Sequence, residues 1–349
     1  MISRSTPRLA TIAVAVVALV AAACGSDDDS ESGTTTPTDT EPAAPSTDTA
    51  DDESTTVETD PPTTEPPATE PPGEPHAADG TASLLPVEFE PQDLITLDPL
   101  LYQAALALGV EPIGTPTFET AAGVGGPLPA YLPADVIADA ELFGTILAPN
   151  LELIAAATPA LVLGTAQFAP PTSESLGGKT EVALFEGSFS DWRAATAFVG
   201  DRLDRRDTAD ALVAEIDARL AGLGDGRTAS VIRFTGPDVL PINEAALGGE
   251  KLVQAGFALP PELAGLSPQQ SLSLEQIELL DTDVIVVVRQ DENDTVSGPD
   301  QFDDWVASPL WEALPAVQRG DVFVVGPCWA TPTAWCAAIV TDDIEEIVR

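Results

Sequence analysis

Two stretches of the chain repeat one pattern: residues 150–164 read NLELIAAATPALVLG and residues 273–287 read SLEQIELLDTDVIVV. Aligned without a gap, Glu152 meets Glu275 in the first turn of a helical segment. In each copy Asn or Ser, both good N-caps, precedes that segment, and an apolar run typical of a buried strand follows it. The repeat therefore predicts two similar helix-then-strand units, one in each half of a folded chain.

Further strands and helices alternate around these two units, which is typical of parallel α/β sheets. The apolar runs that predict strands are residues 93–97, 110–114, 160–163, 181–185, 229–234, 283–288 and 322–325. The patterns that predict shorter helices are residues 100–108, 150–158, 250–255, 273–280 and 342–348. Between the halves, apolar residues recur at helical spacing from Asp191 to about Leu223. We therefore predict two Rossmann-like α/β lobes, residues 81–190 and 225–349, joined by one long helix over residues 191–224.

The N-terminus carries the pattern of an exported lipoprotein. Residues 1–23 combine two arginines with an apolar run that is too short for a comfortable membrane span. Small residues then precede Cys24, which we expect to be the lipid-bearing residue; an ordinary secretory signal with a chance cysteine is the alternative. Residues 24–80 hold 16 Asp and Glu with no Lys or Arg, so we expect a disordered acidic linker rich in Ser, Thr and Pro.

Charge excludes one class of partner. The chain of 349 residues has a formal net charge of −43 at pH 7, and residues 81–349 keep 41 acidic against 12 basic residues. Binding nucleic acid requires a basic face, so we expect no nucleic-acid partner. The single histidine, His76, lies in the expected linker.

The two remaining cysteines, Cys328 and Cys336, stand in the segment PCWATPTAWC. In an exported protein this pair favours a disulfide, with free buried thiols or a metal pair as alternatives. A zinc site is disfavoured because the folded part has no histidine and no third cysteine, and we expect no intrinsic metal or cofactor.

The ordered segments resemble a known family, the substrate-binding lipoproteins of bacterial ABC importers for ferric siderophores, haem and cobalamin. The segments that carry the resemblance are LALGVEPIGTP, NLELIAAATPALVLG, SLEQIELLDTDVIVV and PLWEALPAVQRGDVFVV. The resemblance implies two α/β lobes joined by one helix, and a periplasmic or membrane-anchored monomer that serves a permease dimer and its ATPase. Two departures are Ala160, where the family often has Asp, and the Gly/Pro-rich residues 121–135, which predict an unusual pocket wall.

The resemblance also assigns roles to Glu152 and Glu275. In related importers a surface glutamate on each lobe docks against arginines of the permease. The alternative is that both glutamates only stabilise the helices that they open, since a helix N-terminus favours an anion.

Ligands of open α/β folds lie outside the carboxyl ends of the strands. On that ground Arg233 and Arg289 are candidate contacts to an anionic ferric chelate, with a paired core arginine as the alternative. Trp329 and Trp335, in the segment between the two cysteines, are candidate ligand platforms at the cleft mouth or core residues. Tyr102 and Phe168 complete the candidate ligand contacts.

The leading function is therefore binding of an iron(III)–siderophore complex for import. Cobalamin or haem binding, or a non-transport lipoprotein with a degenerate binding fold, are the alternatives. An enzyme is disfavoured because GxSxG, HExxH and P-loop motifs are absent from the sequence.

Overall fold

All structural statements below concern the residues that the computed structural model describes: 82–119, 124–168, 175–176, 178, 180–267, 269–289 and 301–349. The predicted signal segment, Cys24 and the acidic linker lie outside these residues. No helix in the described part of the chain has the length and apolar character needed to cross a bilayer.

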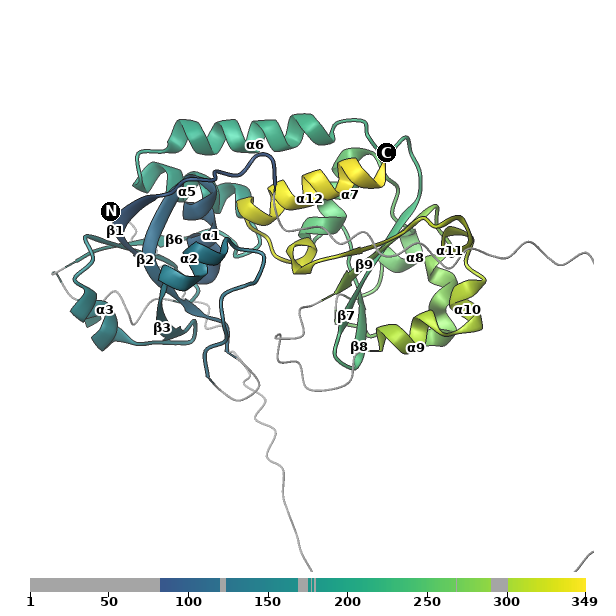
Figure 1. Cartoon of the computed structure of the whole chain (residues 1–349), viewed down its shortest axis with the longest axis horizontal. Coiled ribbons are helices and arrows are strands. Elements are labelled where there is room, and N and C mark those ends of the chain that lie inside the picture. The colour runs from purple at the N-terminus through teal and green to yellow at the C-terminus, as the bar shows by residue number, and fades with distance from the viewer. Residues whose placement is uncertain are drawn as a thin grey trace, which may run out of the picture. The chain divides into compact units, whose positions relative to one another are not determined.

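The first lobe contains a six-stranded sheet of order β4-β3-β2-β1-β5-β6 (Figure 1). Every neighbouring pair is parallel except β3 with β4. The strands are β1 (Glu90–Thr96), β2 (Val110–Thr117), β3 (Glu141–Thr145), β4 (Ala148–Pro149), β5 (Leu161–Thr165) and β6 (Glu181–Phe185). The helices are α1 (Pro99–Ala107), α2 (Ala134–Asp139) and α3 (Leu151–Ala157). The expected strands are confirmed, whereas β3 and β4 were not predicted because Gly144 and Pro149 give that segment a loop-like composition.

Both faces of this sheet are covered, as its continuous apolar strands require. Leu94 of β1 packs in one core cluster, and its neighbour Ile95 packs in another on the opposite face. Asn150 caps α3, because its side-chain oxygen accepts a hydrogen bond from the Leu153 amide at 3.1 Å. The first copy of the repeat is therefore α3 followed by β5.

The second lobe contains a four-stranded sheet of order β10-β9-β7-β8, parallel except for the β7–β8 hairpin. The strands are β7 (Ala229–Thr235), β8 (Asp238–Pro241), β9 (Val284–Arg289) and β10 (Val322–Val325). The helices are α7 (Leu247–Ala255), α8 (Pro261–Ala264), η1 (Leu274–Leu280), α9 (Phe302–Val306), α10 (Pro309–Glu312), α11 (Pro315–Arg319), η2 (Pro327–Ala330) and α12 (Ala334–Ile347). The second copy of the repeat is η1 followed by β9. Here Ser273 and Gln276 form a capping box, although η1 is a 3₁₀ helix.

The predicted bounds of the connecting helix are wrong, because residues 191–224 form two helices, α5 (Trp192–Arg202) and α6 (Arg206–Leu220). Asp204 breaks the helix with a left-handed φ of 55°, and the Arg205 amide bonds back to the Gly200 carbonyl at 2.7 Å. Gly200 permits the turn, because a Cβ there would lie 2.9 Å from the Cβ of Ala209 on α6. Helical spacing of apolar residues continues across this break, so periodicity alone could not reveal it.

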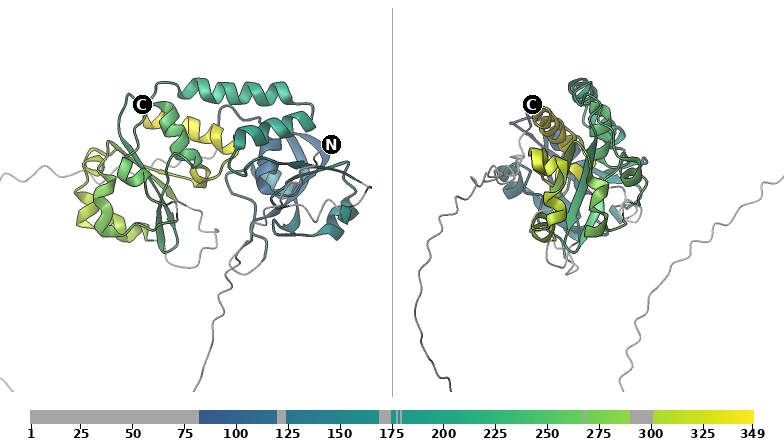
Figure 2. Two further views of the ribbon diagram at one scale, coloured as in Figure 1. Left: turned by 180° about the vertical axis from the view of Figure 1, so that it is seen from behind. Right: turned by 90° about the vertical axis from the view of Figure 1, so that its right-hand side faces the viewer.

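The C-terminal helix α12 is longer than predicted and lies beside α6 in both views (Figures 1 and 2). It shares one hydrophobic cluster with Tyr102 and Leu106 of α1 and with Val284 and Val286 of β9. The two lobes are therefore joined by a continuous buried core as well as by the chain that crosses between them.

Candidate ligand-binding site

Threonine ends four parallel strands of the first lobe. The final residues of β1, β2, β3 and β5 are Thr96, Thr117, Thr145 and Thr165, and all four are buried. Because parallel strands end at one edge of a sheet, these residues lie at the edge where α/β folds bind ligands. The hydroxyls of Thr96 and Thr117 have no hydrogen-bond partner among the described residues. A buried hydroxyl is normally satisfied, so these two are suited to an ordered water or a bound polar group.

Each sheet has a rim of segments at the carboxyl ends of its strands. The N-rim consists of the segments that follow the parallel strands of the first lobe: residues 97–98, 118–119, 146–147, 166–168 and 186–190. The C-rim consists of the last residues of β7 and β9 and the segments that follow β7 and β10: residues 233–238, 289 and 326–330. The threonines were not among the predicted site residues, because their common position appears only when strand ends and pairing are known.

Asp98, on the N-rim, is a buried helix cap. Its carboxylate accepts hydrogen bonds from the amides of Leu100 and Leu101 at 3.1 and 2.9 Å and from the Thr165 hydroxyl at 2.8 Å. Burial away from water raises the pKa of Asp98, and the hydrogen bonds partly oppose this. Asp98 therefore holds the start of α1 and the end of β5 together, with its acceptor oxygens committed to the protein.

Aromatic side chains stand on the N-rim. Phe168 is half-buried and packs edge-to-face on Phe189 with ring centroids 5.1 Å apart, while Phe118 is 48% exposed. Tyr102, in contrast, is fully buried on α1 within the core, and burial raises the pKa of its hydroxyl. Phe168 is thus partly exposed on the N-rim, whereas Tyr102 is not exposed there.

The two candidate arginines point to opposite faces of the second sheet. In the parallel pairing of β7 with β9, Arg233 is opposite Val288 and Phe234 is opposite Arg289. Opposed residues share a face and neighbours along a strand alternate; Val288 and Phe234 indeed belong to different core clusters. The Arg289 guanidinium lies 4.7 Å from the ring centroid of Phe302. Both arginines lie on the C-rim, but they do not converge on one point.

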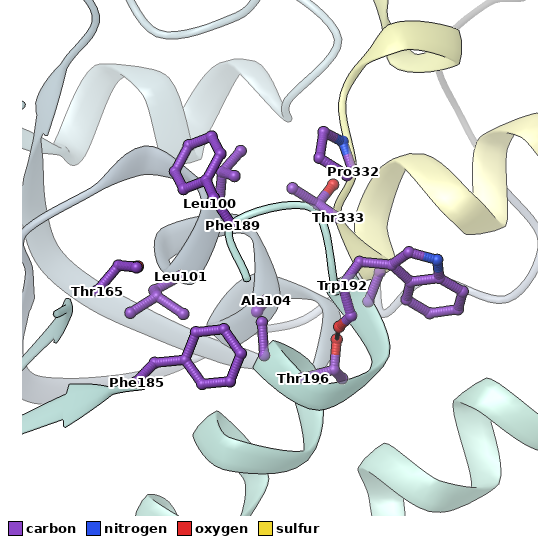
Figure 3. A pocket seen from close by; sticks show the side chains of 12 residues that line it. Leu100, Leu101, Ala104, Thr165, Phe185, Phe189, Trp192, Thr196, Pro332 and Thr333 are labelled. Atoms are coloured by element: carbon purple, nitrogen blue, oxygen red, sulfur yellow. Dashed lines mark hydrogen bonds between the residues drawn. The ribbon is translucent and has the colours of Figure 1, made fainter. Parts of the chain in front are cut away.

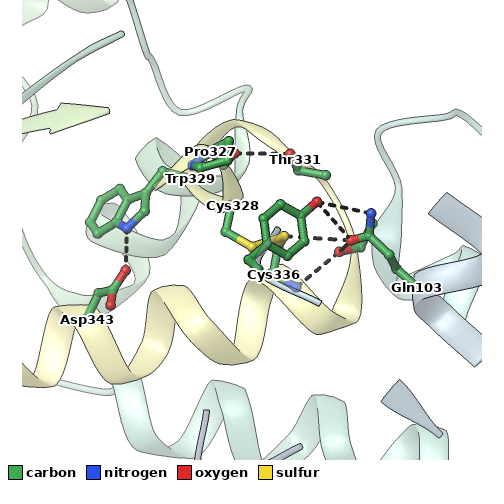
Figure 4. Close-up of a disulfide and its surroundings, with 9 residues drawn as sticks. Gln103, Pro327, Cys328, Trp329, Thr331, Cys336 and Asp343 are labelled. Atoms are coloured by element: carbon green, nitrogen blue, oxygen red, sulfur yellow. Dashed lines mark hydrogen bonds between the residues drawn. A yellow bond between two sulfur atoms is a disulfide. The ribbon is translucent and has the colours of Figure 1, made fainter. Parts of the chain in front are cut away.

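The predicted placement of Trp329 and Trp335 at a cleft mouth is wrong, because both are core residues with 0% and 3% exposure. The Trp329 indole N–H donates to Asp343 Oδ2 at 2.7 Å (Figure 4). Its ring packs on Gly248 of α7, where a Cβ would lie 2.5 Å from a ring carbon. Trp335 lies in the first turn of α12. Neither indole can meet a ligand in this conformation.

Cys328 and Cys336 are joined by a disulfide with Cα atoms 4.8 Å apart, which closes the segment between β10 and α12 (Figure 4). Within this segment Thr333 caps α12, accepting from the Cys336 amide at 3.0 Å, and donates to Gln103 Oε1 at 2.9 Å. The Gln103 amide in turn donates to the Tyr131 hydroxyl at 3.1 Å. These bonds tie the segment that leads back from the second lobe to α1 of the first.

A cavity of about 10 Å³, room for about one water molecule, lies where this segment meets the N-rim. Leu101, Thr165, Phe189, Trp192 and Thr333 contribute to its lining (Figure 3). Its walls are largely apolar, and it is far too small for a drug-sized ligand. The cavity belongs to the junction between the lobes.

Glu152 on α3 and Glu275 on η1 are both exposed, one on each lobe. The Ser273 side chain donates a hydrogen bond to Glu275 and lowers the pKa of its carboxyl. Each glutamate therefore occupies the first turn of its helix and also presents its charge to solvent. Within the described residues, no group of three or more His, Cys, Asp or Glu side chains is arranged to hold a metal ion.

The fold agrees with comparisons to known proteins. The sequence model described as periplasmic binding protein matches residues 95–327, well over half of the chain and parts of both lobes. The chain belongs to the periplasmic binding protein family. This family is one of binding proteins.

Among curated relatives, the iron-uptake system-binding protein of Bacillus subtilis (strain 168) is 24% identical over 211 residues, covering 58% of this chain and 66% of that protein. The achromobactin-binding periplasmic protein of Dickeya dadantii (strain 3937) is 24% identical over 283 residues, covering 77% and 90%.

Among solved structures, the iron-uptake system-binding protein FeuA from Bacillus subtilis superimposes with a TM-score of 0.61 at 21% identity, covering 74% of this chain and 94% of that chain. Staphylococcus aureus SirA complexed with staphyloferrin B gives a TM-score of 0.56 at 22% identity, covering 76% and 98%. At such identities the likeness establishes the two-lobed fold alone.

Proposed function

We propose that this chain is the extracytoplasmic binding component of an ABC importer, which binds an iron(III)–siderophore complex and delivers it to a membrane permease. The observation that carries the proposal is the family match across both lobes, together with two curated relatives named for iron uptake and for achromobactin. The ligand would be held between the N-rim and the C-rim, where Phe168 and Arg233 stand.

The test is isothermal titration calorimetry of the purified chain with ferric catecholate, ferric hydroxamate, haem and cobalamin. We expect tight binding of at least one ferric siderophore. If only haem or cobalamin binds, that compound is the ligand and the siderophore assignment is wrong. Absence of binding to all four would refute the proposal. Arg233→Ala should weaken binding about tenfold, because a charged hydrogen bond to a chelate oxygen is lost. The matched control is Arg227→Ala, which lies before the opposite end of β7 and packs on Phe257.

Glu152 and Glu275 would dock the loaded protein against basic residues of the permease dimer, which works with its ATPase. Their exposure and their matching places on the two lobes support this role. The double variant Glu152→Lys/Glu275→Lys should abolish uptake while leaving ligand affinity intact. Glu215→Lys/Glu262→Lys reverses two other exposed helical glutamates and should leave uptake unchanged. Normal uptake by the first double variant would refute the docking role.

The chain would act as a monomer held at the membrane by lipid on Cys24, with residues 24–80 as the tether. A lipidated cysteine anchors a protein through the burial of its acyl chains. Metabolic labelling with a radioactive fatty acid should mark the wild-type protein and not Cys24→Ala, which should be released from membranes. Equal labelling of both proteins would refute the anchor.

A further inference from the structure

The first lobe is almost devoid of positive charge. Residues 82–190 contain 13 Asp and Glu and a single basic residue, Lys179, which lies outside the described residues. The N-rim carries two exposed glutamates in addition to buried Asp98. Glu119 lies two residues after β2, and Glu186 directly follows β6. The ligand-facing edge of this lobe therefore offers carboxylates, threonine hydroxyls and phenylalanine rings, and its described part offers no cation.

The arginines of the connecting helices are engaged elsewhere. Each of these arginines forms an ion pair with a carboxylate on its own helix or on a neighbouring helix or strand. They are Arg193, Arg202, Arg205, Arg206 and Arg219. Lys251 is fully buried between Asp217 and Glu250. Arg193, Arg219 and Lys251 pair with carboxylates where α5, α6, α7 and α12 meet, whereas Arg202 and Arg205 pair with Glu181 of β6 and Glu90 of β1. None of these cations is part of either rim.

On the C-rim, Arg233 and Arg289 lie on opposite faces of the sheet, and the exposed carboxylate of Asp238 begins β8 beside the end of β7. The described parts of the two rims thus carry two guanidinium groups and the carboxylates of Glu119, Glu186, Asp238 and Asp98. The local balance is negative, and at physiological salt only charges within about 8 Å of a ligand act strongly on it.

We propose that this site selects ferric chelates without net negative charge, such as complexes of iron(III) with three hydroxamates. Three doubly charged catecholates leave a triply negative complex around iron(III), whereas three hydroxamates leave a neutral one. Two rims of net negative charge repel the former, while hydroxyls and phenylalanine rings suit the neutral amide-like surface of the latter. The inference rests on the proposed function and specifies its ligand.

The experiment is calorimetry of the whole chain with three probes: a cationic linear ferric trihydroxamate, a neutral cyclic ferric trihydroxamate and a ferric tris-catecholate. We expect at least one hydroxamate complex to bind about tenfold or more tightly than the catecholate, with a preference that grows as salt is lowered. Equal or tighter binding of the catecholate would overturn the inference and leave the proposed function standing. Absence of binding to all three would count against both.

A variant that removes two carboxylate charges tests whether the N-rim causes the discrimination against the catecholate complex. Glu119→Gln/Glu186→Gln should strengthen binding of the tris-catecholate about three- to fivefold, because two repulsive charges near a triply charged ion are removed. It should leave binding of the neutral hydroxamate complex unchanged. Glu88→Gln is the matched control: it precedes β1 at the opposite edge of the same sheet, about 20 Å from the N-rim at the rise of an extended strand. An equal gain in Glu88→Gln would show a general charge effect and overturn the role of the rims.

Discussion

Lys251 is the buried cation whose removal should change the pH dependence of stability. Its side chain is 0% exposed on α7, with Nζ 4.6 Å from the ring centroid of Trp192 and 2.9 Å from Gln254 Oε1. The carboxylates of Asp217 and Glu250 stand 3.7 Å away. This ammonium group therefore loses its hydration on folding. It contacts one neutral acceptor and an aromatic face, with two carboxylates at longer range.

The consequence is a lowered pKa. Desolvation by burial, followed by repulsion from Arg193, lowers the pKa of Lys251 from its ordinary value of 10.5 to about 8. At about 1.4 kcal/mol per pH unit, the difference corresponds to about 3 kcal/mol. That amount is the cost of keeping the folded protein charged at this position at neutral pH.

The direction in which the free energy of unfolding changes with pH follows from proton binding. Below pH 8 both the folded and the unfolded chain carry the proton on Lys251, and the full cost is present. Between pH 8 and 10.5 the unfolded chain binds more protons, so stability from this group rises with pH and levels off above 10.5. The charged groups that face it are Arg193, Asp217 and Glu250, on α5, α6 and α7.

The assay is urea denaturation at pH 7, 8, 9, 10 and 10.5 for the wild type, Lys251→Met and Lys251→Arg. Neither variant titrates at this position in the window, so subtracting either profile from that of the wild type cancels all other groups. We expect the difference in unfolding free energy to shift by about 3 kcal/mol in favour of the wild type from pH 7 to pH 10.5. Parallel profiles across this range would refute the reasoning, because they would mean that Lys251 keeps an ordinary pKa when folded.

Two other predictions concern the disulfide and the packing of Trp329. Reducing the disulfide, or replacing Cys328 and Cys336 by Ser, should lower the free energy of unfolding by about 2.5 kcal/mol, the chain-entropy value for a loop with a sequence separation of 8; an unchanged urea midpoint would contradict this. Gly248→Ala should destabilise the chain by about 1–3 kcal/mol, because the new Cβ overlaps the ring of Trp329, and should alter near-UV circular dichroism. Gly326→Ala, where a Cβ meets nothing within 4 Å, is the control and should change little.

Much of the architecture could be predicted because it depends on short-range patterns. Buried strands such as β9, whose residues Val284–Val288 are all inaccessible, require an apolar run, and the caps Asn150 and Ser273 require particular side chains. Elements without such patterns were missed. The edge strand β4 has two residues, one of them Pro149, and its pairing with β3 depends on the neighbouring strand.

The candidate site was less predictable, because membership of a loop does not determine which way a side chain faces. Trp335 stands within the helix α12 and is buried by α1 and the shared core, although the sequence PCWATPTAWC is typical of an exposed turn. Arg233 and Arg289 were each candidate ligand contacts, yet strand register puts them on opposite faces of the sheet.

The sequence by itself determined the two helix-then-strand units, the family resemblance and the acidity of both lobes, since these follow from residue order and composition. Tertiary structure alone decided that the connecting segment turns at Asp204, that the tryptophans beside the disulfide form the core, and that threonines line the edge of the first sheet. The physical reason is that burial, pairing register and shared edges join residues far apart in the chain. Such contacts depend on how whole elements pack, which no local pattern records.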